Sequence, residues 1–205
     1  MRQMRMAAVV ALAFSLGGCG YNRIQQLDEQ ADQAKSNIGV ELTARNQLIP
    51  NMVATVKGAA NFERGTYTDV ARARAGQLTA AEQQLNQAQA QTRTAVESKN
   101  VNQLQQAEAA QTRAIGTYLN IAVEAYPQLR ATQNFQALQD QLAESENRIA
   151  VARRDYNESV RNYNTYIRQF PQAITAKVTG AQRKEPYQAP AGSEQAPTVN
   201  FDSAT

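Results

Sequence analysis

Apolar residues recur every three or four positions along most of this chain, and this periodicity constrains the fold more than any other feature. From Tyr21 almost to Phe170 the sequence lacks the apolar–polar alternation that is typical of β-strands. Spacings of three and four place side chains on one face of an α-helix, and their sustained alternation forms a coiled-coil seam. We therefore expect an all-α fold, an antiparallel bundle of about four long helices with coiled-coil-like seams.

Each expected helix has its own seam of apolar and small residues. The first seam comprises Ile24, Leu27, Ala31, Ala34 and Ile38, then, displaced by four, Leu42, Arg45, Ile49, Met52, Val56 and Ala59. The second comprises Leu78, Ala81, Leu85, Ala88, Thr92 and Ala95. The third comprises Val101 or Leu104, Ala107, Ala114, Tyr118, Ile121 or Ala122, and Ala125. The fourth comprises Phe135, Leu138, Leu142, Ser145, Ile149, Ala152, Tyr156, Ser159, Tyr163, Tyr166 and Phe170. Turn-like stretches at 63–69, 98–100 and 126–134 predict the breaks between the helices.

Pro50 lies inside the first expected helix. Its ring removes one backbone hydrogen bond and crowds the carbonyl group of Asn46, at a cost of about 3 kcal/mol. We therefore predict a first helix that is kinked at Pro50, with the bend near Leu48 or Ile49.

Polar residues near this proline form a candidate site with residues of the last helix. The set comprises Arg45, Asn46 and Pro50 on the first helix and Glu146, Asn147 and Arg148 on the last. If the two helices pack antiparallel, Arg45 can contact Glu146 and satisfy the groups that Pro50 frees. The alternative is that these are solvated residues with partners in their own helix, such as Glu144 with Arg148, worth about 0.2 to 0.5 kcal/mol.

Residues 1–18 read as a signal peptide. A charged start is followed by an apolar run from Met6 to Leu16, about half of the roughly 20 residues that cross a bilayer. The motif Leu16-Gly17-Gly18-Cys19 resembles the lipobox of bacterial lipoproteins, in which the cysteine receives a diacylglyceryl group and, after cleavage, an acyl chain such as palmitate. We expect a covalent lipid on Cys19, although an ordinary thiol is the alternative.

The residue after this cysteine bears on location. By analogy with enterobacterial sorting, Gly20, in place of an aspartate, favours the outer membrane, facing the periplasm. We therefore expect a lipid-anchored protein of the bacterial cell envelope.

The composition argues against several functions. The chain holds no histidine and one cysteine, so a nucleophile would lack its usual base. We expect no enzymatic activity, no metal site and no cofactor other than the lipid on Cys19. Two of the 21 basic residues lie in the leader, so the remainder carries 19 basic against 18 acidic residues, and this near balance indicates no nucleic-acid partner.

The periodicity weakens beyond Pro171. The proline, glycine and polar content of residues 181–205 is typical of a disordered tail. The expected organisation is a signal peptide at 1–18, a helical bundle at 19–180 and a tail at 181–205.

The stretches at 21–58 and 125–171 resemble the LemA family of bacterial membrane-attached proteins. The resemblance implies an antiparallel helical bundle held at a membrane by its N-terminus, with no established enzymatic activity. Relatives are often encoded near membrane proteins of the TPM type or metallopeptidases of the M48 type, which suggests adaptor or scaffold work. This chain departs from the usual family pattern because it has a lipobox instead of an uncleaved transmembrane helix.

Two functional hypotheses follow. The first is a non-enzymatic, lipid-anchored scaffold or adaptor that assembles with itself, as a homo-oligomer, or with a membrane-protein partner. The second is a binding protein for a small or lipidic ligand, held between helices near the Pro50 kink. Alanine-rich middle helices leave little room for a large apolar cavity and favour the first.

Overall fold

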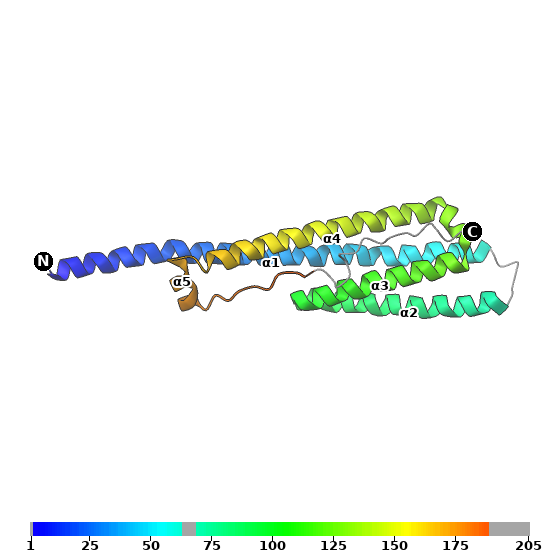
Figure 1. Ribbon diagram of the computed structural model, residues 1–205, viewed down its shortest axis with the longest axis horizontal. Coiled ribbons are helices and arrows are strands. Elements are labelled where there is room, and N and C mark those ends of the chain that lie inside the picture. Colours follow the sequence, from blue (N-terminus) through cyan, green and yellow to red (C-terminus); the bar gives the residue numbers. More distant parts are fainter. Residues whose placement is uncertain (1, 63–68, 189–205) are drawn as a thin grey trace, which may run out of the picture. The chain divides into compact units, whose positions relative to one another are not determined.

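The computed structural model describes residues 2–62 and 69–188, with side chains described for 20–59 and 76–188. Its elements are α1 (Arg2–Phe62), α2 (Asp69–Ser98), α3 (Val101–Ala125), the 3₁₀ helix η1 (Pro127–Ala131), α4 (Gln133–Tyr166) and α5 (Gln172–Thr179) (Figure 1). The described ranges contain helices and no strand, so the all-α prediction is confirmed. The predicted breaks at 98–100 and 126–134 are also confirmed, whereas 63–68 lie outside the described residues.

The chain divides into two compact units. Unit 1 comprises Met1–Arg45 and Asp140–Pro186, and unit 2 comprises Asn46–Gln139 and Tyr187–Thr205. Both α1 and α4 therefore contribute residues to each unit.

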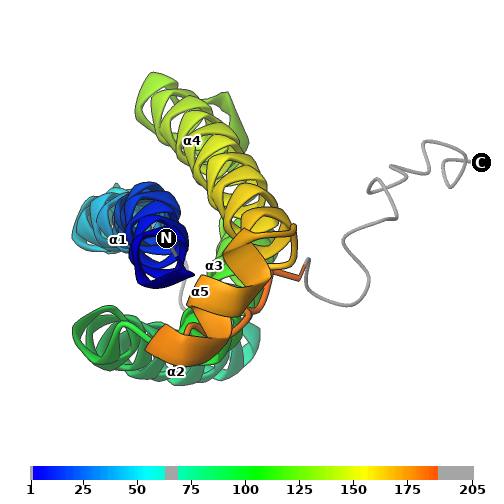
Figure 2. The same cartoon turned by 90° about the vertical axis from the view of Figure 1, so that its left-hand side faces the viewer.

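In unit 1, α1 and α4 run antiparallel. Arg45 pairs with Glu146, while Ile24 and Leu27, earlier in α1, pack with Tyr163 and Ile167, later in α4. The helix α5 adds Ala176 to that apolar cluster. In Figure 2, which views unit 1 from the end where α1 begins, α5 faces the viewer next to the end of α4.

In unit 2, α2 and α3 form an antiparallel hairpin. The link is Lys99, which adopts the left-handed conformation (φ 52°), and Asn100. The side chain of Asn100 caps α3 by accepting hydrogen bonds from the backbone N–H groups of Asn102 and Gln103 at 2.9 and 3.2 Å. All six residues of the predicted second seam are buried, which confirms that seam.

The predicted seam of α4 is correct through Tyr156, and beyond Tyr156 it is correct only at Tyr163. Phe135, Leu138, Ser145, Ile149, Ala152 and Tyr156 are buried, and Leu142 is half-buried. Beyond Tyr156 the buried residues are Val160, Tyr163 and Ile167, whereas Ser159 and Tyr166 are half-buried and Phe170 is 83% exposed. The buried residues take two successive steps of four, from Ala152 to Tyr156 and from Tyr156 to Val160. These steps keep them on one face, because a helix turns every 3.6 residues rather than every 3.5.

The predicted boundary of the tail is wrong for residues 181–188. This segment has no regular secondary structure, yet Asn164 binds both backbone groups of Lys184: its Nδ2 donates to the carbonyl oxygen at 2.8 Å, and its Oδ1 accepts from the backbone N–H at 2.9 Å. The hydroxyl of Tyr156 donates to the carbonyl oxygen of Glu185 at 2.8 Å. Side chains of α4 thus hold a segment whose composition alone is typical of disorder. Residues 189–205 lie outside the described residues.

The helix α1 begins at Arg2 and continues through Pro50 to Phe62. The predicted leader is therefore helical in this chain, and Pro50 does not interrupt the helix; the bend at Leu48 or Ile49 stays a prediction. Across the described residues, no helix combines the length and the apolar character needed to cross a bilayer.

Candidate functional site

The backbone carbonyl that Pro50 leaves without a helical partner is satisfied by a side chain of α2. In an uninterrupted α-helix the N–H of residue 50 would donate to the carbonyl oxygen of Asn46, and proline has no N–H. The side-chain Nε2 of Gln89 donates to that oxygen at 3.0 Å. In return, the backbone carbonyl oxygen of Gln89 accepts from the side-chain Nδ2 of Asn46 at 3.2 Å. The two residues thus form a reciprocal pair that replaces the lost hydrogen bond.

A third amide completes this arrangement from α3. The Nε2 of Gln111 donates to the Oδ1 of Asn46 at 2.5 Å. Gln111 is fully buried and Asn46 is 6% exposed, so neither amide can exchange its partner for bulk water. We call Asn46, Gln89 and Gln111 the amide network, and its neutral groups cost less to bury than charged ones.

The predicted contact between Arg45 and Glu146 is present in unit 1. The Nη1 of Arg45 lies 2.7 Å from Oε2 of Glu146, and the Nη2 of Arg153 lies 3.6 Å from Oε1 of the same carboxylate. The Arg45 side chain is 3% exposed, whereas that of Glu146 is 46% exposed. The role predicted for this contact is corrected, because Gln89 and not Arg45 satisfies the carbonyl that Pro50 frees.

An open groove of about 380 Å³ runs between α1 and α4 in unit 1, and we call it the α1–α4 groove. Its lining comprises Asn37, Val40, Glu41, Glu144, Asn147, Arg148, Val151, Ala152 and Asp155. Val40 and Val151 are 62% and 46% exposed. Arg148 crosses the groove, with its Nε 3.2 Å from Glu41 and its Nη1 2.9 Å from Glu144. With three carboxylates and one guanidinium, the lining favours a partner with apolar and basic side chains.

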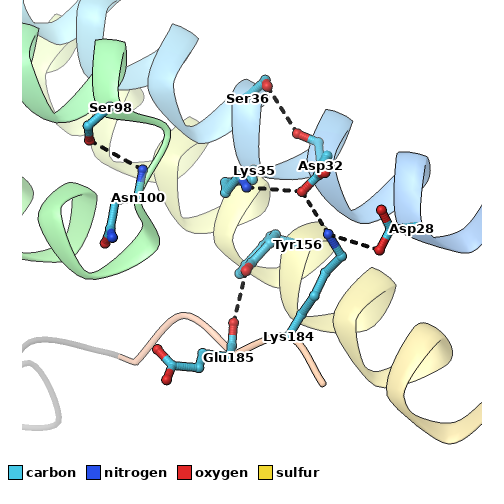
Figure 3. Close-up of polar contacts among 9 residues, drawn as sticks. All are labelled: Asp28, Asp32, Lys35, Ser36, Ser98, Asn100, Tyr156, Lys184 and Glu185. Carbon is cyan, nitrogen blue, oxygen red and sulfur yellow. Dashed lines mark hydrogen bonds and ion pairs between the residues drawn. The ribbon is translucent and has the colours of Figure 1, made fainter. Parts of the chain in front are cut away.

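A second polar cluster holds the C-terminal segment against α1. The Nζ of Lys184 lies between two carboxylates, 2.9 Å from Asp32 and 3.2 Å from Asp28 (Figure 3). It also lies 5.6 Å from the centroid of the Tyr163 ring, a cation–π geometry. We call Asp28, Asp32 and Lys184 the lysine cluster. Its side chains are 20 to 42% exposed, so it lies at the surface of unit 1.

The charges of the lysine cluster shift its pKa values in opposite directions. Burial by itself would raise the pKa of Asp32, but hydrogen bonds and charges from Lys184 and Lys35 outweigh burial and hold that pKa below its ordinary value. Burial would likewise lower the pKa of Lys184, and the two aspartates outweigh it, so this pKa is raised. Both pKa shifts favour the state in which Asp32 and Lys184 are charged.

The structure divides the predicted site residues between the two units. Arg45, Glu146, Asn147 and Arg148 gather on α1 and α4 of unit 1, whereas Asn46 and Pro50 belong to unit 2. The backbone of Leu16, Gly17, Gly18 and Cys19 lies within α1, and their side chains lie outside those described, so lipidation stays a prediction. Among the described residues, no three histidine, cysteine or acidic side chains form a group that could hold a metal ion.

Sequence reasoning missed Gln89, Gln111 and Lys184. Gln111 had a signal, because it fills the gap of seven between Ala107 and Ala114 in the third seam. Gln89 follows a seam alanine and Lys184 lies in a stretch typical of disorder, so neither residue had one.

Comparison with known proteins relates most of this chain to one family. The chain is 26% identical over 181 residues to the magnetosome protein MamQ 2 of Paramagnetospirillum magneticum, and equally to the magnetosome protein MamQ of Magnetospirillum gryphiswaldense. These alignments cover 84% of this chain and 66% of each relative, so the chain spans slightly less than two thirds of their length. A model of the LemA family matches residues 34–201, which include parts of both units, and the chain therefore belongs to the LemA family.

Proposed function

We propose that this protein is a non-enzymatic, lipid-anchored adaptor or scaffold of the bacterial cell envelope. Membership of the LemA family and the likeness to the MamQ proteins support a membrane-associated helical protein. The lipobox motif that ends at Cys19 supports attachment by a covalent lipid, and Gly20 supports the outer membrane, on its periplasmic side.

The α1–α4 groove is the observation that carries the adaptor role. It exposes two valines on a surface that two antiparallel helices form, where a third helix could pack. Exposed apolar side chains rimmed by charges are typical of a protein–protein contact. The partner in this proposal is either a second copy of the chain or a membrane protein, of which the TPM and M48 types are candidates by family association, and it is not a nucleic acid.

Binding of a small or lipidic ligand near Pro50 receives less support. The polar groups around this proline, in Asn46, Gln89 and Gln111, are engaged with one another. A polar ligand would have to break the amide network before it could bind there. The adaptor role therefore remains the better proposal.

Site-specific photo-cross-linking in intact cells tests the adaptor role. A photoreactive amino acid at Val40 should capture a partner that the same amino acid at Thr43 does not, because Thr43 is exposed on the same helix but does not line the groove. Capture of a membrane protein would identify an adaptor, and capture of the chain itself would identify a scaffold. Equal yields at the two positions would contradict the proposal.

The anchor is tested separately by labelling cells with an alkyne-tagged palmitate. The wild-type protein should take up the label, and Cys19→Ala should not. Labelling that persists in Cys19→Ala, or that is absent from the wild type, would overturn the proposed lipid anchor. Neither result would bear on the role proposed for the α1–α4 groove.

A further inference from the structure

Three apolar side chains at the end of unit 1 are left in solvent. Phe170, Ile174 and Val178 are 83%, 59% and 83% exposed. They account for half of the six large hydrophobic residues that are exposed in the described part of the chain, and they fall within nine residues. Ile174 and Val178 are four residues apart and therefore lie on one face of α5, and Phe170 is exposed in the turn before that helix. Such a concentration indicates a contact with another apolar phase.

The opposite face of α5 is attached to the start of the folded unit. Ala176, two residues from both Ile174 and Val178, packs with Ile24 and Leu27 of α1. A Cβ atom at Gly20 would lie 3.6 Å from the Oγ1 of Thr175. The helix α5 is therefore held beside the residue that follows Cys19, the predicted lipidation site.

A basic hollow of about 360 Å³ also lies in unit 1, and one of its lining residues, Arg168, is two positions from Phe170. Its lining comprises Asn157, Val160, Arg161, Asn164, Thr165, Arg168, Arg183 and Pro186, all described residues, and none carries a carboxylate. Arg168 belongs to the same turn as Phe170, and Lys177 adds a cation on α5. Guanidinium groups bind phosphate oxygens in bidentate geometry, so three of them around one hollow fit a phosphate-bearing surface.

We propose that the apolar stripe of Phe170, Ile174 and Val178, together with the basic hollow that includes Arg168, is a second membrane contact that binds an anionic bilayer. The apolar side chains enter the headgroup region and the arginines meet lipid phosphates. This inference rests on the proposed lipid anchor, because the anchor at Cys19 brings the stripe to the bilayer. Membrane attachment commonly combines two signals, and here the second would also orient the bundle relative to the membrane.

Fluorescence tests the contact directly because the chain contains no tryptophan. The full lipidated chain with Phe170→Trp is reconstituted in vesicles of phosphatidylcholine and phosphatidylglycerol. We expect its emission to shift to the blue relative to detergent-free buffer and to be quenched by brominated lipid. The matched control is Arg154→Trp, an exposed position on α4 of the same unit that lines neither the α1–α4 groove nor the basic hollow, which should show neither effect.

A second pair of variants tests the charge. Arg168→Gln combined with Arg183→Gln should lower quenching of the tryptophan at position 170 in anionic vesicles and leave it unchanged in pure phosphatidylcholine. Both arginines are surface residues, and far-UV circular dichroism checks that the variant remains folded.

The outcomes separate this inference from the proposed anchor. If palmitate labels Cys19 but the tryptophan at position 170 is neither shifted nor quenched, the membrane contact is wrong and the anchor stands. If palmitate labelling fails, the anchor is wrong, and the same tryptophan experiment on the unlipidated full chain then decides the contact by itself: quenching supports it, and no quenching overturns it. A blue shift that appears without vesicles and grows with protein concentration would show that a second copy covers the stripe, and would overturn the membrane contact.

Discussion

The amide network of unit 2 and the lysine cluster of unit 1 both connect distant parts of the chain, but with side chains of different chemistry. Each joins chain segments that are distant in sequence through polar side chains. The network uses neutral amides, of which Asn46 and Gln111 are buried and Gln89 is half-buried, whereas the cluster uses charges and keeps its side chains 20 to 42% exposed. Neutral groups tolerate burial once they are paired, while charges retain part of their hydration at a surface. The contribution of the lysine cluster to the free energy of unfolding should therefore depend on pH, and that of the amide network should not.

The largest effect is expected from Gln111→Ala. The substitution leaves the Oδ1 of Asn46 buried without this donor and opens a cavity, which should lower the free energy of unfolding by about 2 to 3 kcal/mol. Urea titrations measure the loss, which should be equal at about pH 5 and about pH 8 because amides do not titrate there.

The control is Gln106→Ala, an exposed glutamine of the same helix, with an expected change within about 0.5 kcal/mol. An equally small change for Gln111→Ala would show that the network adds nothing to stability.

A double-mutant cycle tests the link between Gln89 and Pro50. In the natural sequence Gln89→Ala should cost about 1 to 2 kcal/mol, because the carbonyl of Asn46 loses its donor. In a Pro50→Ala background the N–H of residue 50 can donate to that carbonyl, so the same substitution should cost less than half as much. Chemical denaturation of the four proteins gives the coupling energy. Equal costs in both backgrounds would show that Gln89 does not compensate for the hydrogen bond that Pro50 removes.

A smaller and pH-dependent effect is expected from Lys184→Met. Near neutral pH the loss should be about 1 kcal/mol, since the pair is only partly buried. The lowered pKa of Asp32 contributes stability above its ordinary value of 3.8, and this is lost as the pH falls through the lowered pKa. The raised pKa of Lys184 contributes stability below its ordinary value of 10.5, and this is lost as the pH rises through the raised pKa.

The difference between wild type and Lys184→Met should therefore be constant at intermediate pH and shrink towards both extremes. Thermal unfolding across the pH range measures it, with Arg113→Met, an exposed basic residue of α3, as the control. A difference that does not vary with pH would mean that packing of the lysine stem, and not its charge, holds the segment.

The parts of the fold that could be predicted are those encoded by neighbours in sequence. The second seam, from Leu78 to Ala95, follows from spacings of three and four, and every member is buried. The contact between Arg45 and Glu146 followed from antiparallel packing of two such helices. Beyond Tyr156 only Tyr163 of the α4 seam was predicted correctly, because a strict heptad pattern and the natural turn of the helix diverge over a long helix.

By itself the sequence determined the helical class, the helix breaks after Ser98 and Ala125, and the lost hydrogen bond at Pro50, because each depends on residues within about one helical turn. Only the tertiary structure decided that Gln89, 43 residues from Asn46, supplies the missing donor, and that Lys184, 152 residues from Asp32, orders a segment with the composition of a disordered tail. The physical reason is that a buried or bridging polar group is specified by its partner in space, and helical periodicity carries no record of partners on other helices.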